Sequence, residues 1–600
     1  MVLRMLNPFR MRAGGTAVAQ RTHLQQVLII SHSADASGMD VMDNLCTALE
    51  FGKIGFAVID IARSVPLPAL DAFDSIVICT ERIWELGDEK SASLEKHVRD
   101  GCGMLAAYRC WSEELSAVFG MGSADLAPAM HTTTGLSFDT ELFPGTAGLK
   151  VGNARWEFDH SRYDVSAEQL QPDCQILARD SGKRPVAWSR RHGEGRVVYW
   201  NTEVLFCRAL RGFLLQSVLG TMAVGVSAAA GFAMFHVDDF PVSLSDERRE
   251  PVASEFPDLD WNGFFFGVWH ADMMALREKH GLKYTWYTII NYSDVDNRAD
   301  ADPASFAITS GPEILARRFQ AVETVASDDE YGFHGYNHEP LVEGVWPDLA
   351  TLERKLTLAR QLWQGIVPAP LPTSWVPANN WYHPDHVRLI RKVFPEIREV
   401  CGIFSTGEAG MGEYREFGPE PWDHSLTCLP RETYGYALTP EVRMMMLSQI
   451  AAMGMWTHFV HPDDIYDIPS GPDDNSYRRN AHGQLWRATN AQGTPGLLPQ
   501  LEAWITQVRS LFPWLDFVTT SEAAARYRAH LEASVNVLVS PMGVEVHCDA
   551  GGLFQVRSDA GTKIAADNGA KVIDQRATAN GTLNLVRCRP GKTLLHTRPD

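Results

Sequence analysis

Aspartate and histidine residues that could hold a divalent metal occur in separate runs of this sequence. The run FHVDDFP places Asp238 and Asp239 at the end of an apolar strand, directly before Pro241. At a strand end both carboxylates can reach one cleft, so one can bind a cation while the other stays free to accept a proton. The run HGYNH contains His334 and His338, and this spacing predicts two imidazoles on one face of a helical turn, able to hold one ion.

A third run, WTHFVHP, ends an apolar strand in His461, just before a proline and two aspartates. A histidine at the mouth of a strand can donate a proton to a leaving group. His458 lies inside the same strand, and we expect it to be packed in the core or to support the site residues from behind. Taken singly, each run also fits an ordinary role, such as an aspartate turn or cap, a surface histidine pair or a core histidine. Their order and context together are more specific.

Together, the three runs resemble the motifs of polysaccharide deacetylases of the NodB homology type, over about residues 230–470. The resemblance implies a metal-dependent enzyme that removes N-acetyl groups from an amino-sugar polysaccharide and releases acetate. It implies Zn²⁺, or another divalent transition metal, as the cofactor. The roles that it carries over are general base for Asp238, metal ligands for Asp239, His334 and His338, and general acid for His461.

The sequence departs from that family at its third motif, Arg-x-Pro, which steadies the base. The nearest counterpart, Trp375-Val376-Pro377, has no arginine, and Arg431 in CLPRETYGY is the candidate substitute. The gap from Asp239 to His334 is also long. These features are more similar to the outlying exopolysaccharide deacetylases, the Pel-type and fungal galactosaminogalactan enzymes, which carry extra domains around the deacetylase barrel.

Tryptophan and net charge bear on the substrate. The chain has 54 Lys plus Arg and 74 Asp plus Glu, a net charge of −20, which disfavours nucleic acid and favours a partly deacetylated, cationic glycan. Trp375 and Trp381 in SWVPANNWY are candidates to stack on sugar rings, and Arg431 is grouped with them on the substrate side. Trp286 and Trp456 lie in apolar strand runs, so we expect them in the core. The resemblance adds polysaccharide biosynthesis and export machinery as expected partners.

The elements that must position these residues indicate an α/β protein of several parts. Apolar strand runs alternate with helical segments, a pattern typical of parallel sheets flanked by helices. The first α/β part resembles the flavodoxin/glutamine-amidotransferase-like class, but it has no G-x-C-x-G elbow around Cys110, so we expect no catalysis there. The predicted parts are a tail (1–24), this amidotransferase-like domain (25–228), a distorted (β/α) barrel carrying the deacetylase motifs (229–529) and a small antiparallel β domain (530–600).

Location and reaction class each leave alternatives open. The sequence shows no transmembrane segment and no secretory signal, which predicts the cytoplasm, whereas the family resemblance favours the periplasm or another extracytoplasmic place. The acidic run 294–302 lacks the glycine and glutamate of a calcium loop and is interpreted as a solvated loop. A glycoside hydrolase pairing Asp238 with Asp463 or Glu432, and a catalytically weak glycan-binding protein, are the competing hypotheses.

Overall fold

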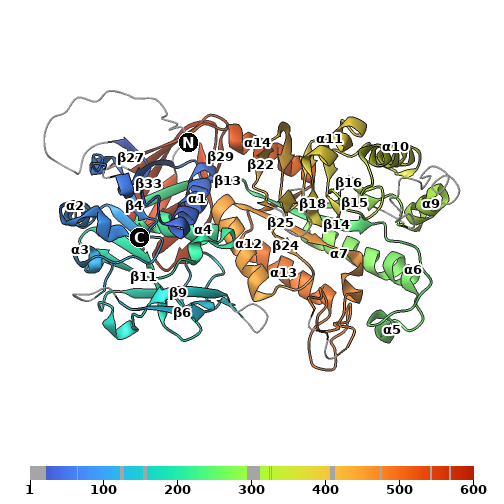
Figure 1. Cartoon of the computed structure of the whole chain (residues 1–600), viewed down its shortest axis with the longest axis horizontal. Coiled ribbons are helices and arrows are strands. Elements are labelled where there is room, and N and C mark those ends of the chain that lie inside the picture. The colour runs from blue at the N-terminus through green and yellow to red at the C-terminus, as the bar shows by residue number, and fades with distance from the viewer. Residues whose placement is uncertain are drawn as a thin grey trace.

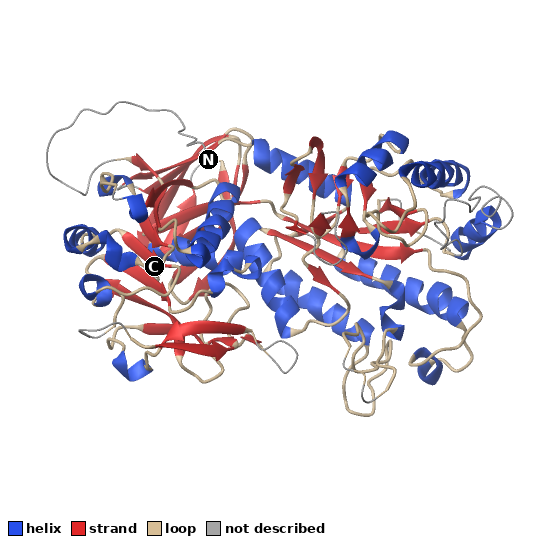
Figure 2. Ribbon diagram, in the orientation of Figure 1, coloured by secondary structure: helices blue, strands red, loops and turns tan. Residues whose placement is uncertain are grey.

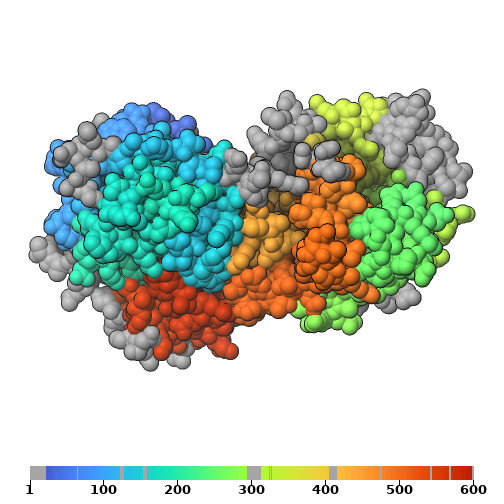
Figure 3. All heavy atoms as spheres, turned by 90° about the horizontal axis from the view of Figure 1, so that it is seen from below, coloured from blue at the N-terminus to red at the C-terminus, as the bar shows by residue number. Residues whose placement is uncertain are grey.

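The computed structural model is a mixed α/β protein built from several sheets (Figures 1 and 2). The first and last parts of the described chain lie together in one half of the molecule, and the green-to-orange middle part forms the other half (Figures 1 and 3). Residues 1–21 of the predicted tail and the acidic run 294–302 lie outside the described residues. The structure describes residues 22–599 except 64, 122–127, 153–157, 293–310, 323–324, 326–327, 406–412, 472–473, 475, 541–542 and 567–568.

The first sheet has nine strands in the order β3-β2-β4-β5-β12-β11-β10-β7-β8. The last four are β11 (Pro185–His192), β10 (Gln175–Arg179), β7 (Leu136–Phe138) and β8 (Lys150–Val151). Its first five strands run parallel, and β2, β4 and β5 are mainly apolar and buried because helices cover both faces. In β2, Val27 and Ile29 pack into one hydrophobic cluster, whereas Leu28 and Ile30 pack into another on the opposite face. The parallel strands are β2 (Gln26–Ser31), β3 (Gly55–Asp60), β4 (Ser75–Ile78), β5 (Gly103–Ala106) and β12 (Gly195–Trp200), and the helices include α1 (Ala36–Phe51), α2 (Asp88–Arg99) and α4 (Arg211–Thr221).

The middle part of the chain forms a curled half-barrel sheet of ten strands. Its order is β22-β23-β19-β17-β16-β15-β14-β25-β24, with β26 also paired to β14, and the path is open over the described residues. The outer strands are β19 (Glu399–Val400), β22 (Gly418–Glu420), β23 (Asp423–Cys428), β24 (Thr433–Tyr434) and β26 (Asp516–Val518). The central strands pair in parallel, so their carboxyl ends meet along one edge, where ligands of such sheets bind. These strands are β14 (Phe232–Phe240), β15 (Tyr284–Ile289), β16 (Glu330–Gly335), β17 (Ser374–Trp375) and β25 (Met455–Val460).

Helices follow these strands and cover the sheet, as α10 (Leu349–Ile366) illustrates. The side chain of Asp348 accepts a hydrogen bond from the Thr351 backbone at 2.6 Å and caps the first turn. Leu352, Leu356 and Trp363 recur at helical spacing and pack into the same core cluster. The other helices of this part include α7 (His270–His280), α9 (Gly311–Ala321), α11 (Pro384–Val393), α12 (Pro440–Met453), α13 (Leu497–Leu511) and α14 (Thr520–Glu532).

The C-terminal strands form two antiparallel sheets, each completed by an earlier segment. β1 (His23–Leu24) pairs with β27 (Val535–Ser540), and β13 (Val224–Ala229) pairs with β29 (Gly552–Ser558). The C-terminal strands are therefore joined to the first part of the chain by backbone hydrogen bonds. None of the described helices combines the length and the apolar character needed to cross a lipid bilayer.

Candidate metal centre and active site

Asp238 and Asp239 lie near the carboxyl end of β14, where the strand is irregular. The pairing with β15 shifts register between Val237 and Phe240, and Asp239 has a positive φ of 55°. A bulge of this kind re-aims side chains that would otherwise alternate between the two faces of the sheet. Asp238 is 1% exposed, and both carboxylates belong to the same edge of the sheet.

The expectation of a helical turn at HGYNH is wrong. His334 is the penultimate residue of β16, and His338 lies in a bend that follows the strand. Gly335 has a φ of 150°, and a Cβ atom there would lie 2.5 Å from the carbonyl oxygen of Asn337. Only glycine allows this close return of the backbone, which brings His338 back beside His334. The two histidines four residues apart are therefore brought together by a bend at Gly335 and not by a helical turn.

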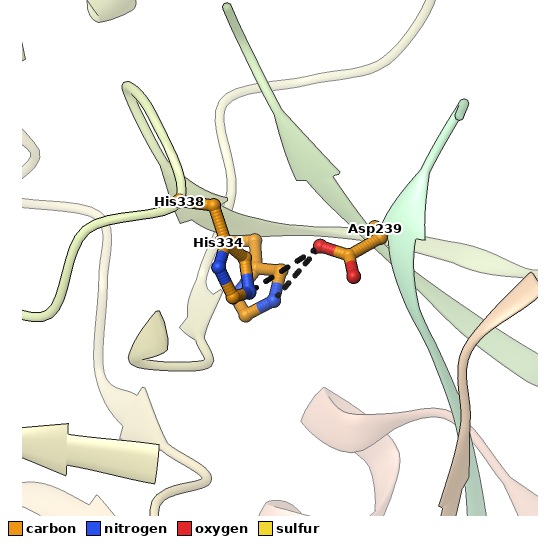
Figure 4. Close-up of side chains that lie close together, drawn as sticks. All are labelled: Asp239, His334 and His338. Atoms are coloured by element: carbon orange, nitrogen blue, oxygen red, sulfur yellow. Dashed lines mark ion pairs between the residues drawn. The ribbon is translucent and has the colours of Figure 1, made fainter. Parts of the chain in front are cut away.

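Asp239 and the two histidines converge on a common point (Figure 4). The Oδ1 atom of Asp239 lies 3.5 Å from Nε2 of His334 and 3.6 Å from Nε2 of His338. The two imidazole rings are nearly perpendicular, with centroids 5.2 Å apart. One atom from each side chain lies within 4.8 Å of the others, so these residues form a group that could hold a metal ion.

The chemistry of these atoms fits a divalent metal. Nδ1 of His334 lies 2.8 Å from the carbonyl oxygen of Val376, which fixes Nδ1 as the donor and leaves the lone pair of Nε2 facing Asp239. Burial lowers the pKa of His334, which keeps the imidazole neutral as a ligand must be. Nε2 of His334 and Oδ1 of Asp239 are buried and have no hydrogen-bond partner among the described residues. Two imidazoles and one carboxylate form a donor set that a divalent metal accepts.

Asp238 is held by a buried arginine. Oδ2 of Asp238 accepts a hydrogen bond from Nη1 of Arg431 at 2.5 Å, and Nη2 of Arg431 donates to Asn380 at 2.5 Å. Burial raises the pKa of Asp238, but the charges of Arg431 and the neighbouring histidines together lower it by more. The net pKa is therefore well below the ordinary value. Arg431 is 2% exposed and therefore contacts the predicted base rather than presenting a substrate-facing surface.

His461 follows β25 and lies beside Asp238, with 3.6 Å between its Nε2 and Oδ2 of the carboxylate. On the other side of the ring, Nδ1 lies 3.2 Å from Oδ1 of Asp464 and 3.0 Å from Nη1 of Arg479. Burial lowers the pKa of His461, but the Asp464 carboxylate more than offsets this, and the net pKa is raised. Sequence reasoning missed the roles of Asp464 and Arg479, although the two aspartates after His461 were a usable signal.

The predictions for the tryptophans have different outcomes. Trp375 is 1% exposed and packs in the core against Tyr382, with ring centroids 5.8 Å apart, so the prediction that it stacks on a sugar is wrong. Its segment contributes the Val376 carbonyl that orients His334. Trp381 keeps part of its surface exposed and stays a candidate. The core positions predicted for Trp286, Trp456 and His458 are confirmed, because all three are fully buried.

Sequence and structure comparisons define the relatives of this chain. It belongs to the family described as an uncharacterised protein conserved in bacteria (DUF2194), whose profile matches residues 129–575. A comparison with curated proteins finds no match.

Solved structures with some likeness include two small proteins and a larger glycosidase. A "putative polysaccharide deacetylase" from Mycobacterium smegmatis is 14% identical, over 50% of this chain and 91% of that one, with a TM-score of 0.28. A "putative thua-like protein" from Bacteroides uniformis is 14% identical, over 36% and 96%, with a TM-score of 0.26. The exo-β-1,4-mannosidase Op5Man5 from an Opitutaceae bacterium is 14% identical, over 30% and 31%, with a TM-score of 0.21. At these TM-scores the likenesses carry no argument about function. An argument about function has to come from the site itself.

Proposed function

We propose that this protein is a metal-dependent hydrolase that removes N-acetyl groups from an amino-sugar polysaccharide and releases acetate. The observation that carries the proposal is the convergence of Asp239, His334 and His338, with unpaired buried ligand atoms, beside an ionised Asp238 and beside His461. A divalent ion held by these three residues supplies Lewis acidity, which makes water a stronger acid and polarises a carbonyl group.

Asp238 and His461 are suited to opposite proton transfers. The low pKa of Asp238 leaves it ionised, so it accepts a proton from the attacking water. The raised pKa of His461 favours its charged form, so it donates a proton to the sugar amine as acetate leaves. Environments that push two neighbouring pKa values apart are typical of an acid and base pair. Arg431 keeps the base ionised and oriented, as the missing motif arginine would.

The proposal extends to the parts around the site. The curled sheet fits a distorted deacetylase-type (β/α) barrel, and the parallel strand order β3-β2-β4-β5-β12 fits a flavodoxin- or amidotransferase-like unit without catalytic function. We carry over from the Pel-type resemblance an exopolysaccharide substrate, as in biofilms, an extracytoplasmic site of action and contact with polysaccharide biosynthesis or export machinery. Trp381 remains the candidate for stacking on the glycan.

The decisive experiment couples metal analysis to an acetate-release assay on N-acetylhexosamine oligosaccharides, for the intact protein and His334→Ala. We expect one bound ion per chain, loss of activity with a chelator, and recovery with Zn²⁺. His334→Ala should weaken metal binding by more than the roughly 100-fold cost of losing an outer partner, and should release no acetate. His424→Ala, which changes an exposed histidine of β23 (Asp423–Cys428), is the matched control and should behave like the unchanged protein.

A glycoside hydrolase is the second candidate, because one more carboxyl lies near the site. Burial, and then the charge of Asp239, raise the pKa of Asp463 to about 6, which suits a general acid. Against it, Asp238 is committed to Arg431, and Glu432 forms an ion pair with Arg208. New reducing ends without acetate, unaffected by a chelator, would favour this candidate. A protein that binds the glycan but forms neither product would be the catalytically weak binder.

A further inference from the structure

Tyr292 lies just after the end of the strand that separates the aspartates from His334 in the sheet. It follows β15, which lies between β14, the strand of Asp239, and β16, the strand of His334. In the register, Thr288 is opposite Phe240 and Ile289 is opposite Gly335. The chain therefore emerges at Tyr292 from the position between the two halves of the candidate metal centre.

The hydroxyl group of Tyr292 is buried and has no hydrogen-bond partner among the described residues. A buried polar atom left unpaired costs free energy, so it requires an explanation. Burial, and then the charge of Asp239, raise the pKa of Tyr292 well above its ordinary value; Arg318 lowers it by less, and Asp463 and Asp238 add smaller increases. The phenol thus remains a protonated donor within reach of the charges of the site carboxylates.

The ring of Tyr292 is held in place by a buried cation. The guanidinium carbon of Arg318 in α9 lies 4.6 Å from the ring centroid, and Arg318 is 1% exposed. Its nitrogens donate to main-chain carbonyls directly beyond β14 and at the end of β15. One side chain therefore links the segments that follow these two strands and also contacts the phenol ring. The acceptors and distances are Val242 at 3.1 Å, Pro241 at 2.9 Å, Ile290 at 3.1 Å and Ile289 at 2.9 Å.

We propose that the Tyr292 hydroxyl is a hydrogen-bond donor of the active site that binds the carbonyl oxygen of the substrate's acetyl group. This inference rests on the proposed function and adds a donor that the sequence motifs do not contain. Tyr292 loses no proton: it donates a hydrogen bond that strengthens as negative charge develops on that oxygen during attack. Arg318 is the positioning residue that keeps the donor aimed.

The test compares Tyr292→Phe with Tyr284→Phe in the metal-loaded protein. Tyr284 is a tyrosine of β15, the strand that Tyr292 follows, and its buried hydroxyl already donates to the Met273 carbonyl at 3.0 Å, so it is the control. Loss of one such donor lowers kcat roughly 100-fold, and we expect this for Tyr292→Phe with unchanged KM and metal content. Its thermal midpoint should not fall, because no hydrogen bond to a described residue is lost, whereas that of Tyr284→Phe should fall.

A second measurement does not depend on turnover. Acetohydroxamate presents a carbonyl-like oxygen to a metal, and calorimetry should show roughly 10-fold weaker binding to Tyr292→Phe than to the unchanged protein. Suppose that the unchanged protein releases acetate and that Tyr292→Phe has the same kcat and the same acetohydroxamate affinity. That result would overturn the Tyr292 assignment alone. An unchanged protein that binds no metal and releases no acetate would overturn the proposed function, and the assignment with it.

Discussion

The two parallel sheets of this protein end in similar polar residues but use them differently. At the carboxyl edge of the first sheet, Asp35 accepts hydrogen bonds from the Gly38 backbone at 3.0 Å, the Thr80 hydroxyl at 2.6 Å and the Glu81 backbone at 3.0 Å. The carboxylate therefore caps α1 and ties it to the end of β4. Nothing in this arrangement leaves an acceptor waiting for a ligand.

Arg109 extends the same pattern after β5. Its guanidinium pairs with Glu203 at 2.7 Å and with Glu81 at 3.2 Å, and Glu203 also accepts from the backbone and hydroxyl of Ser161. The carboxylates along this edge thus all accept from neighbouring groups, although Nε of Arg109 is buried without a hydrogen-bond partner among the described residues. Their number alone would have suggested a site, yet their pairing indicates a structural network.

The edge of the curled sheet presents the opposite case. Oδ1 of Asp239, Nε2 of His334 and the hydroxyl of Tyr292 are buried and without a hydrogen-bond partner among the described residues. Buried polar groups are normally paired, so three unpaired groups at adjoining strand ends mark a place built for something else to bind. What separates the two edges is therefore the state of pairing, and each variant below tests that distinction.

The largest effect is expected for Arg431→Met, which removes the hydrogen-bond partner of Asp238 and leaves this carboxylate unpaired. Without the guanidinium, burial would raise the pKa of Asp238 and leave its carboxylate poorly oriented. General-base help is worth roughly 10²–10⁴-fold, so we expect kcat to fall by about 100-fold or more, with metal content retained. Arg431→Lys restores the charge and should recover part of the loss; equal kcat in both variants and the unchanged protein would refute the role.

A smaller effect, on pH dependence, is expected for Asp464→Asn. His461 acts in its protonated form; burial lowers its pKa, and the Asp464 charge raises it by more. Removing that charge lowers the pKa, so the protonated form is lost at lower pH and the alkaline limb of the kcat profile should move down by about one unit. Arg479 acts in the opposite direction, so Arg479→Gln should move the same limb upward. A limb that stays in place in both variants would exclude His461 as the general acid.

Sequence reasoning succeeded where a local pattern carries the physics. Apolar runs buried on both faces identified β2, β4, β15 and β25, and the three motif runs found the residues that converge. The glycine bend at Gly335 was missed because its φ is not visible in a histidine spacing. The burial of Trp375 was missed because packing, not residue type, decides whether a ring is exposed.

Contacts between distant segments had no local signal. Arg431 bonds to Asp238 across 193 residues, and only its residue type suggested the contact. Arg318 lies on an ordinary amphipathic helix, and Tyr292 follows an ordinary apolar strand, so neither drew attention. The pairing of β1 and β13 with C-terminal strands is equally non-local, because strand partners are chosen by the whole fold.

The smallest effect on catalysis is expected for Arg109→Met, which unpairs the edge of the first sheet. Breaking a buried ion pair typically costs about 3 kcal/mol, so urea unfolding should show a loss of that order, compared with less than about 0.5 kcal/mol for the exposed Arg63→Met. Metal content and kcat should equal those of the unchanged protein, because the network serves only the fold. A change in kcat or metal affinity without loss of stability would mean that this edge is coupled to the metal centre, and the contrast between the two sheets would fail.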